Sequence, residues 1–147
     1  MGEIELFKRK LSLVELESAL RSFEQVDAPV THNFADGVYV RELLIPKDSL
    51  IIGKRHRKET LNIVLKGCLS LYMGENVPVK RIEAPAIFTS PPFSKKMAYA
   101  HEDTIFLNVH PTEEKDLEEI ERQFIITEEE YNLLLSDEGE KLCLGQQ

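Results

Sequence analysis

The chain has few of the features that would place it in a specialised class of protein. Tryptophan is absent, and the two cysteines, Cys68 and Cys143, form neither a disulfide framework nor a metal-spaced pair. This usage fits a reducing compartment, so we expect a cytoplasmic protein. No apolar run approaches the roughly 20 residues that a membrane span requires, and residues 1–5 are acidic, without the apolar core of a signal peptide. We therefore expect no membrane partner.

Length and composition indicate one folded domain. The chain has 147 residues, of which 42% are hydrophobic and 30% are charged. These values exclude a disordered chain and leave enough apolar residues for a core. Composition alone indicates no function.

The net charge of −8 is unevenly distributed along the chain. Residues 112–147 carry 12 acidic and three basic residues, whereas residues 1–111 carry 14 acidic and 15 basic residues. Because the body of the chain is near neutral, overall attraction to nucleic acid is not expected, although a local basic patch stays open.

The pattern near the N-terminus predicts a helix over residues 12–23. Ser12 and Glu15 form a capping box, in which each side chain bonds a backbone N–H of the first turn. The apolar positions behind the cap recur at helical spacing. They are Leu13, Leu16, Leu20 and Phe23.

The last third of the chain is predicted to be helical again. Thr112 is expected to cap a first helix with an apolar stripe, and Thr127 with Glu130 forms a capping box for a second. Residues 137–139 are expected to end the second helix. The stripes comprise Leu117, Ile120 and Phe124, then Tyr131, Leu134 and Leu135.

The centre of the chain is predicted to be β, because short apolar runs alternate with turn residues. The runs are residues 37–40, 43–45, 50–52, 61–65, 69–72, 86–88 and 105–109. Many short strands at such spacing are typical of an antiparallel sandwich or barrel. We therefore divide the chain into an N-terminal helical arm (1–29), a β-barrel (30–111) and an acidic C-terminal helical arm and tail (112–147).

Residues 53–67 carry the most informative pattern. Alternate residues of a strand share one face, so a regular strand would present a row of polar side chains on one side. That row comprises His56, Lys58, Thr60 and Asn62. The opposite face is expected to enter hydrophobic packing through Leu61, Ile63 and Leu65.

The same stretch resembles the first motif of the cupin superfamily. That motif runs from a glycine through His-x-His and a glutamate to a second glycine. Counted back from Gly67, the glutamate position falls on Thr60, the second histidine on His56 and the first histidine on Lys54. The second cupin motif, Pro-x-Gly-x-x-His, resembles residues 91–96, with Lys96 in place of the histidine.

This resemblance implies a mainly β fold, a small cupin-type jelly roll or β-barrel with one N-terminal helix and two short C-terminal helices. It also implies a homo-oligomer, because cupins often associate through sheet edges and helical arms. More narrowly, residues 53–56, 61–62 and 84–96 resemble small cupin-like proteins of tailed-phage genomes, whose function is generally unassigned. A phage origin would place the protein in the host cytoplasm.

The departures from the cupin pattern concern the metal site. Three of its four ligand positions are Lys54, Thr60 and Lys96, and a charged lysine repels a divalent cation while threonine is a poor ligand. We therefore expect no metal cofactor. The alternative is a metal-dependent enzyme with an altered site made of His56 and Glu59, which requires a bulge that turns Glu59 inward.

The substituted positions instead predict a ligand pocket at the barrel mouth. Cationic and hydrogen-bonding groups in a concave apolar site suit a small anionic or carbonyl-rich ligand. The predicted ligand-binding residues are His56, Thr60, Asn62, Lys96, Lys95 and Lys54. Structural interpretations stay open beside this one: Arg55 and Arg57 suit a solvated edge, and His56 or Asn62 suits a hydrogen-bonded anchor.

Three classes of function remain. The first is a non-catalytic protein that binds a host metabolite or nucleotide signal, the second is the altered metalloenzyme, and the third is a structural or assembly protein of a phage particle. Further histidines are weaker candidates: His32 and His110 lie at predicted strand ends, and His101 lies in a predicted turn. Cys68 is expected to be a small core residue.

Overall fold

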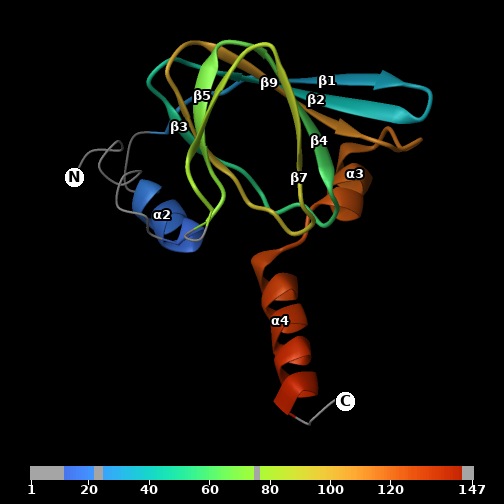
Figure 1. Cartoon of the computed structure of the whole chain (residues 1–147). Coiled ribbons are helices and arrows are strands. Elements are labelled where there is room, and N and C mark those ends of the chain that lie inside the picture. The colour runs from blue at the N-terminus through green and yellow to red at the C-terminus, as the bar shows by residue number, and fades with distance from the viewer. Residues whose placement is uncertain (1–11, 22–24, 75–76, 144–147) are drawn as a thin grey trace.

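The computed structural model describes residues 12–21, 25–74 and 77–143. Two antiparallel sheets wrap around a common interior, and a long C-terminal helix projects away from them (Figure 1). The first sheet has the order β1 (Val30–Ala35), β2 (Val38–Ile45), β9 (Thr104–His110), β4 (Thr60–Lys66) and β7 (Ala86–Ser90). The second has the order β3 (Leu50–Ile52), β8 (Met97–Ala100), β5 (Cys68–Tyr72) and β6 (Lys80–Glu83).

Three of these strands, β1, β6 and β8, were not predicted. β1 is exposed at every position, and β6 buries only Ile82, so neither has the apolar run that signals a strand. β8 has four residues, which is too short for a clear alternating pattern. These strands form through pairing with β2 and β5, which sequence periodicity does not report.

The main hydrophobic core lies between the two sheets. Inward residues of the central strands are buried, and partly buried side chains, most of them alanines, pack around them. The buried members are Leu43, Ile45, Val64, Leu69, Leu71, Ile82, Ala100 and Phe106. Cys68 is also buried, as predicted.

The predicted facing of β4 is wrong. Thr60, Asn62 and Val64 point inward and are buried, whereas Leu61 and Leu65, which were expected inside, are 38% and 56% exposed. Ile63, expected inside as well, shares their outward face and is half-buried.

Hydrogen bonds from neighbouring strands explain why polar residues occupy the inner face of β4. The Asn62 side-chain amide donates to the Thr60 carbonyl at 3.1 Å and to Ser90 Oγ at 3.2 Å. Its oxygen accepts from Asn108 Nδ2 at 2.8 Å. Because these buried groups are satisfied, their burial costs little.

The N-terminal helix α2 (Leu13–Leu20) begins as predicted. Ser12 is its N-cap, and the Ser12 hydroxyl accepts from the Glu15 backbone N–H. Leu13 and Leu16 are buried against residues of the second sheet and its neighbours, namely Leu50, Tyr72 and Met97. The predicted extension to Phe23 lies outside the described residues.

Helix α3 (Leu117–Phe124) is capped by Asp116 and not, as predicted, by Thr112. Asp116 directly precedes the helix and accepts from the Glu118 backbone N–H at 2.9 Å, whereas Thr112 Oγ1 accepts from an N–H of the preceding turn. Two members of the predicted stripe, Ile120 and Phe124, are buried with Tyr39, whereas the third, Leu117, is 44% exposed.

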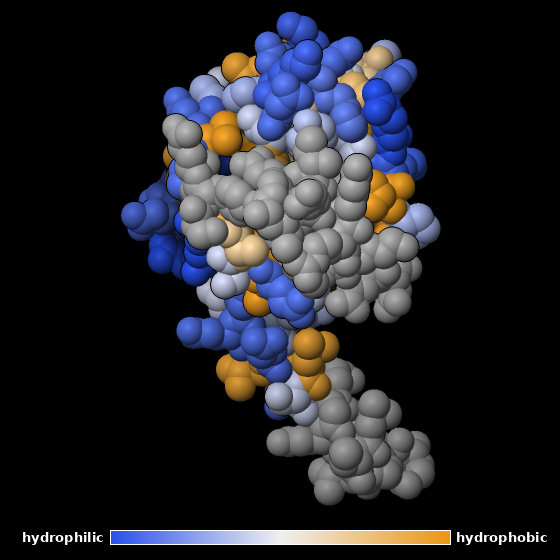
Figure 2. Space-filling view, turned by 90° about the vertical axis from the view of Figure 1, so that its left-hand side faces the viewer, coloured by the Kyte–Doolittle hydropathy of each residue, from blue (hydrophilic) through white to orange (hydrophobic). Residues whose placement is uncertain are grey.

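Helix α4 (Glu128–Cys143) starts at the predicted capping box, in which the Glu130 N–H donates to Thr127 Oγ1 at 3.1 Å. It does not end at residues 137–139 but runs on to Cys143, so it is not short. Leucines of its described part are exposed, and apolar side chains show on the projecting helix in Figure 2. Among the described residues, no helix has the length and apolarity needed to cross a membrane.

Candidate functional site

A cavity of about 650 Å³ lies in the barrel, and residues of α3 help to line it. One part of its wall is apolar and comes from strands of both sheets. Those residues include Leu43, Ile45, Ile51, Leu71, Ala98 and Phe106. A volume in this range is typical of pockets for small organic molecules.

The other part of the wall is polar and basic. β2 contributes Arg41, β9 contributes Asn108 and His110, and Lys96 stands immediately before β8. His56 lies in the loop between β3 and β4. Backbone hydrogen bonds fix this loop, because the His56 N–H donates to the Ser94 carbonyl at 3.0 Å and the His56 carbonyl accepts from the Phe93 N–H at 2.8 Å.

A row of stacked rings lines one side of the cavity. The His56 and His110 ring centroids are 5.6 Å apart, and those of His110 and Tyr39 are 5.8 Å apart. Tyr39 stacks in turn on His32, and its hydroxyl is hydrogen-bonded to His32 Nδ1 at 2.7 Å. Phe124 of α3 packs on His110 with centroids 4.4 Å apart. These rings hold the imidazoles in fixed orientations.

Two of the histidines that line the cavity, His56 and His110, are neutral at physiological pH. Burial, followed by repulsion from Lys96, lowers the pKa of His56 to about 3. Burial, followed by repulsion from Arg41 and then Lys96, lowers the pKa of His110 to about 4. His56 is 9% exposed, and its Nδ1 has no hydrogen-bond partner among the described residues.

Lys96 is a buried cation. Burial lowers its pKa to about 8, so it remains mostly protonated at pH 7. Its Nζ donates to Ser90 Oγ at 3.2 Å. Within the described ranges, neither Lys96 nor Arg41 forms a salt bridge with a carboxylate. Two carboxylates, Asp27 and Glu121, also line the cavity, and Glu121 pairs with Lys54, so the lining keeps a small excess of positive charge.

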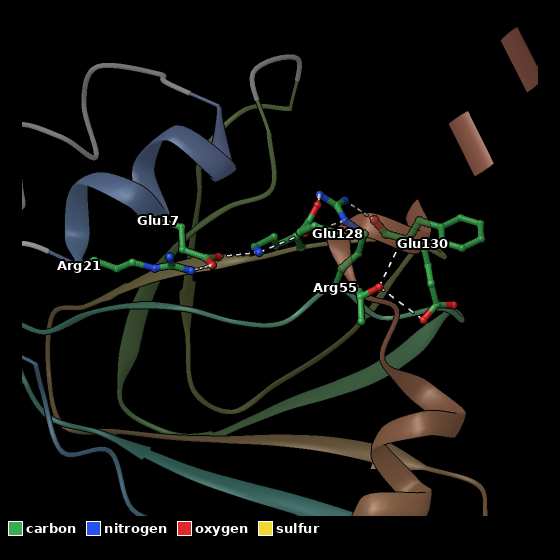
Figure 3. A network of polar contacts seen from close by, with 8 residues as sticks. Glu17, Arg21, Arg55, Glu128 and Glu130 are labelled. Carbon is green, nitrogen blue, oxygen red and sulfur yellow. Dashed lines mark hydrogen bonds and ion pairs between the residues drawn. The ribbon is translucent and has the colours of Figure 1, made fainter. Parts of the chain in front are cut away.

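Three basic residues outside the cavity are, in contrast, paired with carboxylates of the helical arms. Arg55 donates to both Glu128 oxygens at 3.2 and 3.3 Å, and Lys95 lies 2.6 Å from Glu17 and 3.2 Å from Glu128 (Figure 3). Arg57 contacts Glu130 at 3.0 Å. These pairs join α2, the barrel and the start of α4.

The structure brings half of the predicted ligand-binding residues to the cavity. His56, Lys96 and Lys54 line it. Thr60 and Asn62 are buried behind its wall, where Thr60 Oγ1 donates to the Lys58 carbonyl and Asn62 supports Asn108.

Lys95, the remaining member of the predicted set, and two further residues are not free to bind a ligand in the cavity. Lys95 does not line the cavity and belongs to the network with Glu17 and Glu128. Lys54 lines the cavity edge, but its amine pairs with Glu121 of α3. Glu59 is exposed and does not line the cavity that His56 lines. Within the described residues, no cluster of three or more histidine, cysteine, aspartate or glutamate residues is placed to hold a metal ion.

Sequence reasoning missed Arg41 and Asn108 and gave His110 and His32 little weight. The inward residues of β9 alternate along the strand, and Asn108 and His110 follow the buried Thr104 and Phe106 on the same face. That alternation was visible in the sequence. Its functional meaning was not, because it depends on the register that sets β9 between β2 and β4.

No protein-family model matches the chain, and no curated protein matches it. Among solved structures, a putative ethanolamine utilization protein Q from Salmonella typhimurium has 12% identity and a TM-score of 0.50, covering 60% of this chain and 72% of that chain. A cupin domain from Bordetella pertussis has 16% identity and a TM-score of 0.49, covering 62% and 99%. KdgF from Halomonas sp. has 12% identity and a TM-score of 0.49, covering 65% and 88%.

At such identities the likeness concerns the fold alone. The two antiparallel sheets and the likeness at a TM-score of 0.50 confirm the predicted mainly β fold, and a cupin domain is among the structural neighbours.

Proposed function

We propose that the protein binds a small organic anion in its barrel cavity and does so without catalysis. One observation carries this proposal: Arg41 and Lys96 line the same cavity with no carboxylate partner among the described residues. An unpaired buried cation is costly in free energy, and a bound anion offsets that cost through charge-assisted hydrogen bonds.

The polar wall offers several contacts to such an anion. The Arg41 guanidinium suits a planar carboxylate or a phosphate, which it can bind through two parallel N–H donors. His56 adds a neutral imidazole whose Nδ1 lacks a partner within the described residues. Asn108 lines the cavity as well, held by its bond to Asn62.

The apolar wall supports a ligand with an apolar body. A free inorganic ion would leave Leu43, Leu71 and Phe106 without ligand contacts. An aliphatic or aromatic acid would bury apolar surface against them. An amphipathic organic anion therefore fits the cavity better than phosphate or sulfate. A nucleotide signal, with an aromatic base and an anionic group, belongs to the same chemical class.

The donor set does not fit a divalent metal. The positions that correspond to cupin ligands include Lys54, Thr60 and Lys96, and two cations, Arg41 and Lys96, face the two histidines. Positive charge beside the two histidines opposes the binding of a metal cation. The altered metalloenzyme is the alternative, and metal that remains at one equivalent after dialysis against a chelator would replace the present proposal with it.

The biological setting stays a prediction. The resemblance to small cupin-like proteins of tailed phages motivates a role in sequestering a host metabolite or nucleotide signal in the host cytoplasm. The third class, a structural protein of a phage particle, would be favoured by finding the chain in purified virions.

The proposal is tested with pairs of probes that differ in charge and little else. Octanoate with octanol, benzoate with benzyl alcohol and AMP with adenosine are titrated against the full chain, and the melting temperature is measured. We expect at least one anion to raise the melting temperature while its neutral counterpart does not, since ligand that binds only the folded state stabilises it. Equal shifts from both members of every pair, or no shift at millimolar concentration, would contradict the proposal.

A further inference from the structure

One lysine amine is buried inside the barrel and has a single polar contact. The Lys96 Nζ donates to Ser90 Oγ at 3.2 Å, its one hydrogen-bond partner among the described residues, and it forms no ion pair with a carboxylate there. Lys54, the other lysine in the cavity lining, pairs with Glu121 of α3. Lys96 is therefore the cavity lysine that no described carboxylate holds in the ammonium form.

These surroundings favour the unprotonated amine. Burial lowers the pKa of Lys96 to about 8, so roughly a tenth of the amine is unprotonated at pH 7. Lysines in apolar pockets or beside another cation become nucleophiles in this way. Both conditions apply, because the same cavity is lined by Leu71, Ala98 and Arg41. Lys96 can therefore form a covalent bond with a ligand carbonyl carbon as well as an ion pair with a ligand anion.

A row of polar side chains on the inner face of the first sheet joins Lys96 to a second cation. Arg41 of β2 lies opposite Asn108 of β9, and Asn108 lies opposite Asn62 of β4. The Asn62 amide donates to the same Ser90 oxygen that accepts from Lys96. Neighbouring strands are about 5 Å apart, so the two cations stand at the ends of a short row, within the reach of one small ligand.

A buried imidazole nitrogen lies beside both cations. Arg41 and Lys96 each lower the pKa of His56, which places both charges near this ring. His56 is 9% exposed, and its Nδ1 has no hydrogen-bond partner within the described ranges. A neutral imidazole nitrogen accepts or donates a hydrogen bond according to its tautomer. It therefore suits a ligand oxygen that is a carbonyl before a reaction and a hydroxyl during it.

We propose that the cavity ligand is an α-oxo acid with an apolar chain, that Lys96 binds its carbonyl carbon as an imine, and that Arg41 holds its carboxylate. The inference rests on the proposed function and names the ligand class. The Lys96 amine attacks the carbonyl carbon, and a carbon–nitrogen double bond replaces the carbon–oxygen double bond. The two protons that the ammonium group gives up leave with the oxygen as one water molecule. Nothing is oxidised or reduced, and water reverses the step, so the protein retains the ligand and does not convert it.

Other ligands use the cavity less fully. A ketone without an acidic group would leave the Arg41 guanidinium without a carboxylate. An acid without a carbonyl would use Lys96 only as a charge and would bring no second oxygen to His56. An α-oxo acid places a carboxylate and a carbonyl on adjacent carbons and so serves all three side chains, while its chain contacts the apolar wall formed by Leu43 and Phe106.

The test is reductive trapping of the full chain with phenylpyruvate or α-oxooctanoate and sodium cyanoborohydride, which delivers a hydride to an imine carbon. The intact mass and the fragments of the modified peptide are measured. We expect one adduct per chain, on Lys96, formed at least about 10-fold faster than on any other lysine. Arg41→Met should slow trapping by about 10-fold, because it removes a charge-assisted contact to the carboxylate. Lys96→Met should give no adduct, whereas Lys80→Met, on exposed β6, should react as the wild-type protein does.

Two matched probes each lack one functional group. Phenyllactate has the carboxylate without the ketone, and we expect it to raise the melting temperature without any adduct. Phenylacetone has the ketone without the carboxylate, and we expect it to be trapped about 10-fold more slowly than phenylpyruvate. Because the adduct is mapped in the wild-type chain, the result does not depend on the folding of a variant.

Three results would overturn the inference: adducts spread over the exposed lysines, equal trapping of phenylacetone and phenylpyruvate, or no adduct from either oxo acid. If no adduct forms but phenyllactate still raises the melting temperature, the covalent step is wrong and the proposed anion site remains. If no adduct forms and neither phenyllactate nor any anion of the charge-matched pairs raises the melting temperature, both are wrong.

Discussion

Two groups of cations in this molecule lie close in sequence and differ in their surroundings. Arg55, Arg57 and Lys95 meet carboxylates of the helical arms, and their charges are neutralised. Arg41 and Lys96 face a cavity with neutral histidines and, within the described residues, no carboxylate partner. Lys95 and Lys96 are adjacent and both buried, yet they belong to different groups, because neighbouring side chains of an extended segment point to opposite sides.

The difference teaches how a basic run should be interpreted. A sequence of cations predicts neither a binding site nor a solvated edge until the location of the acidic residues is known. Here carboxylates of the helical arms pair with Arg55, Arg57 and Lys95, whereas Arg41 and Lys96 at the cavity have no carboxylate partner within the described residues. Each prediction below disturbs one side of this comparison.

The largest effect should come from acid. The pKa values of His56 and His110 are lowered to about 3 and about 4, so both contribute stability that is present above their unfolded pKa of 6.5. As the pH falls below 6.5, the unfolded state binds more protons, and each histidine removes up to about 1.4 kcal/mol of unfolding free energy per pH unit. We expect several kcal/mol to be lost by pH 4 in urea unfolding measurements.

The matched controls are His110→Gln and His56→Gln, which remove one titrating group while carboxylates elsewhere still titrate. Each should reduce the slope of unfolding free energy against pH between pH 6.5 and 4. Slopes equal to that of the wild-type protein would show that the imidazoles are not held neutral.

The next effect concerns the anion itself. Arg41→Glu replaces one cavity cation by a carboxylate, which would form an ion pair with Lys96. We expect the affinity for the best anionic probe to fall by about 100-fold or more, as like-charge repulsion replaces a charge-assisted contact. Lys80→Glu makes the same change in net charge on the exposed part of β6 and is the control. Equal losses in the two variants, measured by calorimetry, would reduce the effect to overall charge.

A smaller effect is expected in the neutralised group. Glu128→Gln leaves Arg55 and Lys95 with fewer charge-assisted bonds, and the Lys95 side chain is 5% exposed. Since Glu17 still pairs with Lys95, we expect the unfolding free energy to fall by about 2 kcal/mol. Glu129→Gln, at the neighbouring exposed position, should change it by less than about 0.5 kcal/mol. Similar losses in both variants would contradict the account.

The smallest effect has the opposite sign. Lys96→Met removes a buried cation without a carboxylate partner, and we expect it to stabilise the ligand-free protein by about 1 kcal/mol at pH 7. The pKa of Lys96 is about 8 in the folded protein and 10.5 in the unfolded chain, so wild-type stability rises relative to the variant between these two pH values. The gain should therefore shrink above pH 8. A destabilised Lys96→Met protein would show that the cation is compensated.

Local signals predicted the starts of α2 and α4 correctly, missed the cap of α3, and predicted the sheet poorly. The Ser12 and Thr127 caps depend on residues within one turn, so the sequence contains all of their partners. The facing of β4 depends on Ser90 and Asn108, which reach Asn62 from other strands. With apolar residues on both sides of the sheet, periodicity could not identify the inner face.

The candidate site was predicted only where the cupin resemblance applied. His56 and Lys96 occupy positions of the two motifs, and both line the cavity. Arg41 lies on β2, outside either motif, and it joins the cavity because β2 pairs with β9. Lys95 pairs with Glu128 of α4. The cupin motifs lie in the barrel and give no information about this helix.

The central claim is that an anion binds in the cavity next to Lys96. It is tested most directly by the dissociation constant of the best anionic probe at pH 7, measured by calorimetry for the wild-type protein, Lys96→Met and Lys80→Met. A charge-assisted hydrogen bond in such a site contributes about 1.5–3 kcal/mol, so Lys96→Met should bind roughly 10- to 100-fold more weakly. Lys80→Met should bind as the wild-type protein does. A Lys96→Met protein with wild-type affinity would contradict the account.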